Sequence, residues 1–379
     1  MNSKICELLG IEFPLVAFSH CRNVVAEVSK AGGMGVLGAV GMSPAELDVE
    51  LAWIDANCDG KPYGVDVLIP NKMVGKTEEG ITAETLADMV PQEYRDFRAD
   101  ILEKQGIDAG DLRKPSKLGA SMGTNMRDEG AQRLLEVAFS YPIKLIANAL
   151  GVPPQWMLDM GKEHGVKVAA LVGAKEHAIR QVQAGVDILV VSGTEGGGHC
   201  GSVSSMVLIP EVHQAIQPFG DTPILAAGGI VTGRQMAAAM AMGADGAWTA
   251  SVWLTTSDAE TSQTVKEKML AASSSDTVRS RSRTGKHSRQ LRSGWTDAWE
   301  GSELEPLPMP LQSMVSEPAL ALIDREAEKG QAGAKELATY WIGQGVGLLT
   351  QEKSARAVVQ EFKEDFLAGH ERLNSFLSE

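Results

Sequence analysis

This sequence is poor in cysteine and in long apolar stretches, and each shortage excludes a class of protein. The four cysteines are scattered along 379 residues and form no Cys-x-x-Cys pair, which argues against a disulfide scaffold or a structural zinc site; we expect no metal. No apolar segment approaches the roughly 20 residues that a membrane span needs. The segment Met1–Leu9 also lacks the apolar core of a signal peptide, so we expect a cytoplasmic protein without membrane contact.

Net positive charge is also missing, because 49 acidic residues outnumber 35 Lys and Arg and leave a formal charge of −14. Such a protein is repelled by nucleic acids and by anionic membranes, so a small molecule is the expected partner. The segment Arg279–Arg292 is locally basic. Without interleaved aromatic residues it is unlike a nucleic-acid arm, and we expect a loop that folds over an anionic ligand or pairs with acidic neighbours.

Short apolar runs alternate with helical stretches, which is the pattern of βαβ units and a parallel sheet. Several runs are hydrophobic almost throughout, as strands buried on both faces are. Helices at 23–31, 174–184 and 233–242 end at glycines, as C-caps require. The fold class is therefore α/β, a (β/α)8 TIM barrel. The eight expected strands are 13–17, 34–39, 63–69, 143–147, 166–171, 187–191, 223–227 and 246–249.

The spacing of these elements predicts a barrel formed by residues 1–70 and 142–255. Residues 71–141 are too many for one crossover and carry charged helical stretches at 84–94 and 92–104. We expect a helical insertion over the barrel mouth, acting as a lid or substrate wall; the alternative is a solvated decoration. Residues 256–379 are expected to form a C-terminal helical cap region.

Two strands run into glycine turns at the end of the barrel where ligands bind. The second strand leads into Gly228 and Gly229, whose N–H groups, with the helix start near Thr232, can bind an anion. Ala250 and Ser251, after the last strand, could complete the same cup. Two such junctions suggest a cofactor that carries a phosphate. Ordinary tight turns are the alternative.

The first glycine junction, Gly193–Gly201, holds a single histidine, His199. A histidine among glycines has no apolar face to fill, so we interpret His199 as the catalytic acid or base. Ser192, at the end of the preceding strand, and His20, after the first strand, are candidate substrate contacts. No Gly-x-Gly-x-x-Gly follows the first strand, which argues against a Rossmann domain.

The chain resembles the nitronate monooxygenase family, formerly called 2-nitropropane dioxygenases, which includes related NAD(P)H:quinone reductases and flavin enoyl-acyl-carrier-protein reductases. The resemblance spans roughly residues 5–255 and extends to 284–286, 295–300 and 343–347. The motifs that carry it are Gly193–Gly201, similar to the family's loop Ala-Gly-Gly-His-x-Gly, the stretch Ala226–Ile230, and Met242–Gly246 before the last strand.

The resemblance implies a barrel that holds non-covalent FMN under a smaller helical domain, with His199 as the family's histidine beside flavin and substrate. Asp66 stands where many relatives have an asparagine near the flavin, and could disfavour an anionic reduced flavin. Relatives have Ala-Pro-Met where this chain has Ala17-Phe18-Ser19, so the flavin surroundings could differ there. The implied FMN contacts are Ala17, Phe18, Asp66, Gly196, Gly197, Gly228, Gly229, Ala250 and Ser251.

The implied activity is the FMN-dependent oxidation of alkyl nitronates, such as propionate 3-nitronate, by O2 to carbonyl compounds and nitrite. One alternative is a flavin reductase that takes hydride from NAD(P)H and reduces a quinone or an enoyl thioester. Another is a barrel that binds FMN or a phosphorylated metabolite without catalysis. A homo-oligomer and the use of NAD(P)H stay open.

Overall fold

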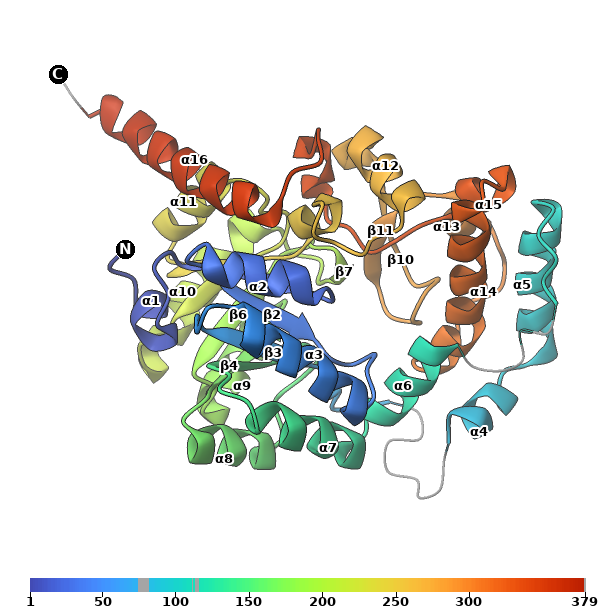
Figure 1. The fold of residues 1–379 in the computed structure, drawn as a ribbon, viewed down its shortest axis with the longest axis horizontal. Helices are drawn as coiled ribbons and strands as arrows, with labels where there is room; N and C mark the ends of the chain where they lie inside the picture. Colours follow the sequence, from blue (N-terminus) through green and yellow to red (C-terminus); the bar gives the residue numbers. More distant parts are fainter. Residues whose placement is uncertain (74–81, 111, 113–115, 378–379) are drawn as a thin grey trace.

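Eight parallel strands close into a barrel that forms the larger part of the molecule (Figure 1). The computed structural model describes residues 1–73, 82–110, 112 and 116–377. Strands pair in chain order, and β1 pairs with β9 to close the ring. This confirms the predicted α/β barrel and all eight predicted strands, with ends that differ by up to two residues. The strands are β1 (Leu15–Ser19), β2 (Met34–Gly38), β3 (Tyr63–Val67), β4 (Leu145–Asn148), β5 (Lys167–Val172), β6 (Ile188–Ser192), β8 (Ile224–Ala227) and β9 (Gly246–Thr249).

Helices cover the outside of the barrel between these strands, and local signals fix their ends. Ser43 and Thr232 start α3 and α11 with capping boxes, and Gly185, with φ of 91°, ends α9 in a left-handed conformation. The three predicted helices are therefore confirmed. The helices are α2 (Arg22–Lys30), α3 (Pro44–Asn57), α7 (Asp128–Phe139), α8 (Gln155–His164), α9 (Lys175–Ala184), α10 (Ser205–Ile216) and α11 (Gly233–Ala241), with α1 (Lys4–Leu9) before β1.

The last helix, α16 (Ala355–Ser375), completes the ring by packing against α11 and α2 (Figure 1). Its buried residues Val358, Val359 and Phe362 belong to the same hydrophobic cluster as the outer faces of the strands. The chain thus leaves the barrel after β9 and returns about a hundred residues later with the helix that covers the β9–β1 side. The far end of α16 projects beyond the body.

A second hydrophobic core lies beside the barrel and is built from two distant stretches of the chain. Leu102 of the first stretch shares this core with Trp295 and Val315 of the second. Helix α7 falls within the predicted insertion 71–141, but it packs against α3 and α8 on the barrel. The division of the chain into domains at residues 70, 141 and 255 stays a prediction. The first stretch holds α4 (Ala83–Asp88), α5 (Gln92–Lys104) and α6 (Lys117–Asn125), and the second α12 (Gln263–Ala271), α13 (Gly294–Glu300), α14 (Leu311–Glu328) and α15 (Ala332–Leu337).

The helices of this second core, α4–α6 and α12–α15, are called the cap from here on. A small antiparallel sheet, ordered β10-β11-β7, joins the cap to the barrel mouth. It consists of β7 (Gly198–His199), β10 (Thr277–Ser280) and β11 (Ser288–Leu291). Within the expected loop over 279–292, the ends belong to strands β10 and β11, and residues 281–287 form the turn between them. The expected pairing with acidic neighbours is confirmed by Arg281–Glu305 and Arg283–Glu317.

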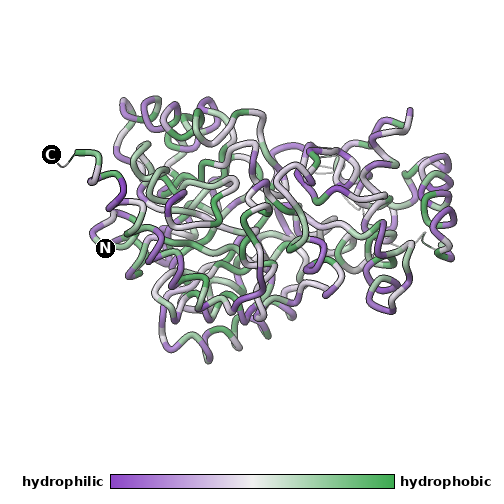
Figure 2. The backbone as a smooth tube through the Cα atoms, turned by 90° about the horizontal axis from the view of Figure 1, so that it is seen from above, coloured by the Kyte–Doolittle hydropathy of each residue, from purple (hydrophilic) through white to green (hydrophobic). Residues whose placement is uncertain are grey.

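Toward the middle of the molecule the chain is more hydrophobic, whereas the helices at its edge alternate hydrophilic and hydrophobic turns (Figure 2). The barrel interior is filled by one apolar cluster that includes Val16, Leu145 and Leu225. Across the described residues, no helix combines the length and apolar character that crossing a membrane would require. The barrel is therefore a packed core whose open end can carry a site.

Candidate active site

The predicted site residues gather at one end of the barrel, because the carboxyl ends of parallel strands meet at the same rim. Phe18 lies near the end of β1, Asp66 on β3 and Ser192 at the end of β6. The turns Gly228–Gly229 and Ala250–Ser251 follow β8 and β9 directly. The loop with Gly196 and Gly197 leads from β6 into β7, which brings His199 to the same rim.

His199 is held by the hairpin rather than by the barrel itself. It lies on β7 and pairs with Ser288 of β11. Its Nε2 lies 2.8 Å from the hydroxyl of Thr284, a buried residue in the turn of the hairpin. Burial and the nearby Lys286 ammonium lower the pKa of His199 to about 4, so the imidazole is neutral at neutral pH.

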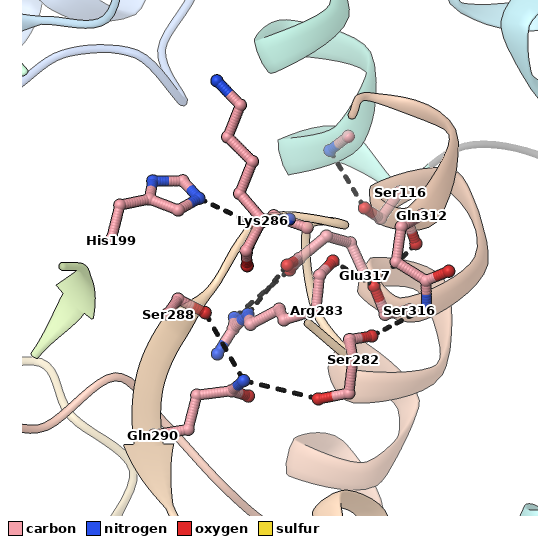
Figure 3. A network of polar contacts seen from close by, with 12 residues as sticks. Ser116, His199, Ser282, Arg283, Lys286, Ser288, Gln290, Gln312, Ser316 and Glu317 are labelled. Carbon is pink, nitrogen blue, oxygen red and sulfur yellow. Dashed lines mark hydrogen bonds and ion pairs between the residues drawn. The ribbon is translucent and has the colours of Figure 1, made fainter. Parts of the chain in front are cut away.

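The contacts of Thr284 indicate which nitrogen of His199 is free. The Thr284 hydroxyl can donate to the backbone carbonyl of Lys286, at 3.3 Å. In the tautomer that carries its proton on Nε2, His199 donates to this hydroxyl, and the hydroxyl donates to the Lys286 carbonyl. The unprotonated Nδ1 is then available as a base, and Figure 3 shows it turned away from the hairpin.

A buried polar network fastens the hairpin to α14 (Figure 3). The Arg283 guanidinium forms two hydrogen bonds with the Glu317 carboxylate, at 2.8 and 3.2 Å, and both side chains are about 95% buried. The guanidinium also lies 3.7 Å from the centre of the Trp341 ring. Gln312 of α14 donates to the Ser282 carbonyl at 2.8 Å. These contacts hold the turn that carries Thr284, and so the position of His199.

A cavity of about 600 Å³ opens beside His199. Ser192 lines it from β6, and Lys286 lines it from the hairpin. Its other walls come from the loops after β3 and β4, from the end of β5 and from α9. Of the sequence-predicted residues, Ser192 and His199 therefore share one cavity.

The two glycine junctions lie against each other. Gly228 and Gly229 have φ of 96° and 70°, conformations that favour glycine. A Cβ on Gly228 would lie 2.6 Å from Ser205 Oγ, and one on Gly229 would lie 3.0 Å from Glu195 Cβ. Consecutive residues of this kind leave backbone N–H groups available to an anion.

The turn after β9 is connected to the loop between β6 and β7 through a segment near the C-terminus. The backbone N–H of Gly343 donates to Ser251 Oγ at 2.8 Å, and that of Gln344 donates to the Glu195 carbonyl at 2.8 Å. A Cβ on Gly197 would lie 2.8 Å from the Gly343 nitrogen. Residues 343–345 thus brace the loops that carry Gly196, Gly197, Ala250 and Ser251.

Asp66 is a buried carboxyl group inside the barrel. Its neighbours Val65 and Val67 pack toward the outer helices, so the alternation of a strand turns Asp66 inward. Asp66 is 5% exposed, and its Oδ2 has no hydrogen-bond partner among the residues that the structure describes. Burial raises the pKa of Asp66 well above its ordinary value, which favours the neutral acid.

The β1 residues occupy the other side of the mouth. The Ala17 side chain belongs to the hydrophobic cluster between the strands and the surrounding helices. Phe18 packs against the hydrophobic cluster that fills the inside of the barrel. His20 Nδ1 lies 3.1 Å from the Gly38 carbonyl, and its ring meets Phe18 edge-on at 5.1 Å between centroids. The surrounding protein and the charge of Arg283 lower the pKa of His20, although the residue is exposed at the barrel mouth. Of the two predicted contacts on β1, the Phe18 side chain is the one on the inner face.

Sequence reasoning missed the residues that position His199 and surround its cavity. Thr284 and Lys286 lie in the stretch 284–286, which the family resemblance already included, but no role was assigned to them. Lys72 and Arg180, which also line the cavity, stand in no motif. Only the folded chain places these residues near His199.

Three comparisons with known proteins place the chain among its relatives. The family model described as nitronate monooxygenase matches residues 2–365. Rv1533 of Mycobacterium tuberculosis, named as a candidate monooxygenase, is 52% identical over 97% of both chains. A protein of Staphylococcus saprophyticus named as a probable nitronate monooxygenase is 26% identical over 95% of this chain and 96% of its own. Nitroalkane oxidase from Streptomyces ansochromogenes shares the fold, with a TM-score of 0.78 at 22% identity over 97% of this chain and 99% of that one.

Proposed function

The chain belongs to the nitronate monooxygenase family, and from that premise we propose that it oxidises alkyl nitronates with O2 and bound FMN. Propionate 3-nitronate is an example of such a substrate, and the products are a carbonyl compound and nitrite. The observation that carries this proposal is His199, a neutral imidazole beside a cavity at the barrel mouth. The same family matches carry the cofactor assignment.

The residues at the mouth fit a flavin mononucleotide. The positive-φ pair Gly228–Gly229 presents backbone N–H groups suited to its phosphate, with Gly196, Gly197, Ala250 and Ser251 beside it. Phe18 and the backbone of Ala17 would contact its ring system. The unpartnered Oδ2 of Asp66 offers the hydrogen-bonding group that a polar ring edge needs. FMN, when bound, supplies the redox chemistry of the reaction.

The protein's own groups prepare the substrate. For a neutral nitroalkane, Nδ1 of His199 takes the proton from the carbon next to the nitro group. Burial and the Lys286 charge lower the pKa of His199, which keeps the imidazole neutral and able to accept that proton. Ser192 and His20 are proposed as further substrate contacts. A nitronate arrives without that proton, so it needs only binding and orientation.

Replacing His199 by asparagine tests the base role. We expect His199→Asn to lower kcat/KM for 2-nitropropane by about 100-fold or more, the usual contribution of a general base, and to lower it less than about tenfold for propyl 2-nitronate. His177→Asn is the matched control, because His177 lines the same cavity without a role in the proton transfer. Equal losses on both substrates would contradict the base role.

The visible spectrum of the purified protein tests the cofactor and the reaction class. We expect an oxidised flavin that stays yellow after anaerobic addition of NADH or NADPH and reacts when propionate 3-nitronate is added. Bleaching within seconds by a nicotinamide would assign the chain to the NAD(P)H-dependent reductases instead. A colourless protein that takes up no FMN would contradict the proposal as a whole.

A further inference from the structure

The cavity beside His199 is basic, although the protein as a whole carries a charge of −14. Lys72, Arg180 and Lys286 line it, and among the described residues its lining contains no aspartate or glutamate. The three side chains come from separate parts of the fold: the loop after β3, helix α9 and the turn of the β10–β11 hairpin. The fold thus gathers three cations around one space.

The charged groups of these three side chains are available to a ligand. Within the part of the chain that the structure describes, none of them has an ion-pair or hydrogen-bond partner. Lys175, one turn before Arg180 on the same helix, differs in this respect because its Nζ lies 3.1 Å from Glu211. Partial burial lowers the pKa of Lys286, although the residue as a whole is exposed.

A buried polar group on the same wall also lacks a partner. Gln181 is 2% exposed and lines the cavity. Its Nε2 donates to the Gly151 carbonyl at 2.9 Å, whereas its Oε1 accepts no hydrogen bond from any residue that the structure describes. The first turn of α9 opens nearby, and its N-cap residue Ala174 has no side-chain oxygen to cap it. This wall therefore offers the Arg180 guanidinium and one hydrogen-bond acceptor to a ligand.

We propose that Lys72, Arg180 and Lys286 bind a phosphate group that the substrate carries at a distance from the carbon oxidised beside His199. A phosphate monoester carries nearly two negative charges at neutral pH, and with the single charge of a nitronate these match three cations. An O–H or N–H beside the phosphate would satisfy Gln181. The cavity volume lies in the range of about 300–1,000 Å³ typical of small-molecule sites, whereas a nitronate of a few carbon atoms would leave much of it empty. The inference rests on the proposed function for the reacting end of the substrate.

Calorimetric titration of the full-length, FMN-loaded protein tests this site without turnover. The probes are n-butyl phosphate, pentanoate and 1-pentanol, which share chain length and differ in charge. We expect n-butyl phosphate to bind at least about tenfold more tightly than 1-pentanol, with pentanoate between them, as charge-assisted hydrogen bonds predict. Arg180→Gln and Lys286→Met should each weaken n-butyl phosphate about five- to tenfold. Lys175→Gln, whose amine is already paired, should leave its Kd within about twofold.

Three results of this titration would overturn the phosphate assignment. Equal affinities for the three probes would show that charge is not recognised, and pentanoate binding as tightly as n-butyl phosphate would assign the cations to a carboxylate. Binding of n-butyl phosphate only to flavin-free protein would assign them to the cofactor's own phosphate. If n-butyl phosphate binds through Arg180 but nitronates are not oxidised, the phosphate site stands and the proposed function fails. If nitronates are oxidised but Arg180→Gln does not change phosphate binding, the proposed function stands and the phosphate site fails.

Discussion

At the scale of the residue, a hydrogen bond decides what His199 can do. The imidazole has two nitrogens, and a base must present the unprotonated one to the substrate. Because Thr284 Oγ1 has the Lys286 carbonyl as an acceptor, it holds the proton of His199 on Nε2. The glycine-rich context of the sequence pointed to His199. It could not point to Thr284, which lies 85 residues away and meets His199 only through the β7–β11 pairing.

Replacing Thr284 by valine tests this positioning. Thr284→Val keeps the shape but removes the acceptor for Nε2–H, so both tautomers of His199 become populated. We expect kcat/KM for 2-nitropropane to fall roughly 3- to 10-fold, the value of one ordinary hydrogen bond, with little change for propyl 2-nitronate. Thr284→Ser should restore the activity. A loss shared by both substrates would indicate a merely structural role for the hydroxyl.

The pH dependence of proton abstraction follows from the pKa of His199. Because burial and Lys286 lower that pKa to about 4, the imidazole stays a neutral base as pH falls through its ordinary value of 6.5. We expect the acidic limb of kcat/KM for 2-nitropropane to lie near pH 4. Lys286→Met removes the charge effect, which is smaller than the effect of burial. The pH at which kcat/KM falls off on the acidic side should therefore rise but stay below 6.5. Lys175→Met is the control, and a limb at 6.5 in the unmodified protein would contradict the assignment of His199 as the base.

At the scale of the element, the strands of the barrel could be predicted and the strands of the hairpin could not. A strand buried on both faces is a continuous apolar run, which the sequence displays directly. β7 has two residues, and β10 and β11 carry arginine and serine rather than an apolar alternation. Their pairing depends on α14, which neutralises Arg283 with Glu317. The basic composition of this segment therefore reflects a buried contact that a sequence cannot reveal.

The Arg283–Glu317 pair should be essential to the hairpin, and a neighbouring pair provides the control. Arg283→Met leaves the Glu317 carboxylate buried without a partner, which costs about 3–5 kcal/mol of unfolding free energy. Arg281 pairs with Glu305 at the surface, where the carboxylate is 86% exposed, so Arg281→Met should cost less than about 1 kcal/mol. Urea unfolding measures both. The double variant Arg283→Met/Glu317→Leu should recover much of the loss, and equal costs at positions 281 and 283 would contradict this account.

At the scale of the whole molecule, the chain closes its barrel with a helix from its far end. The sequence indicates eight strands and the helices between the early ones. It does not indicate which later helix covers β9 and β1, because the cap intervenes. The apolar face of α16 is clear, but the same pattern would suit a helix in the cap. Its packing against α2 and α11 settles its place, and it also makes barrel and cap depend on each other for folding.

Truncation tests this dependence, because the two halves of α16 differ in burial. Ala355, Val358, Val359 and Phe362 are buried, whereas Leu367, Leu373 and Phe376 are more than half exposed. Burying one large apolar side chain contributes about 1.5–3 kcal/mol, so the first half supplies a stabilisation comparable to the 5–15 kcal/mol of a whole domain. We expect a chain ending at Ser354 to be insoluble or unfolded by circular dichroism. A chain ending at Gly369 should retain its Tm within about 4 °C, since it keeps the buried half; a folded, active protein ending at Ser354 would show that the barrel closes without its eighth helix.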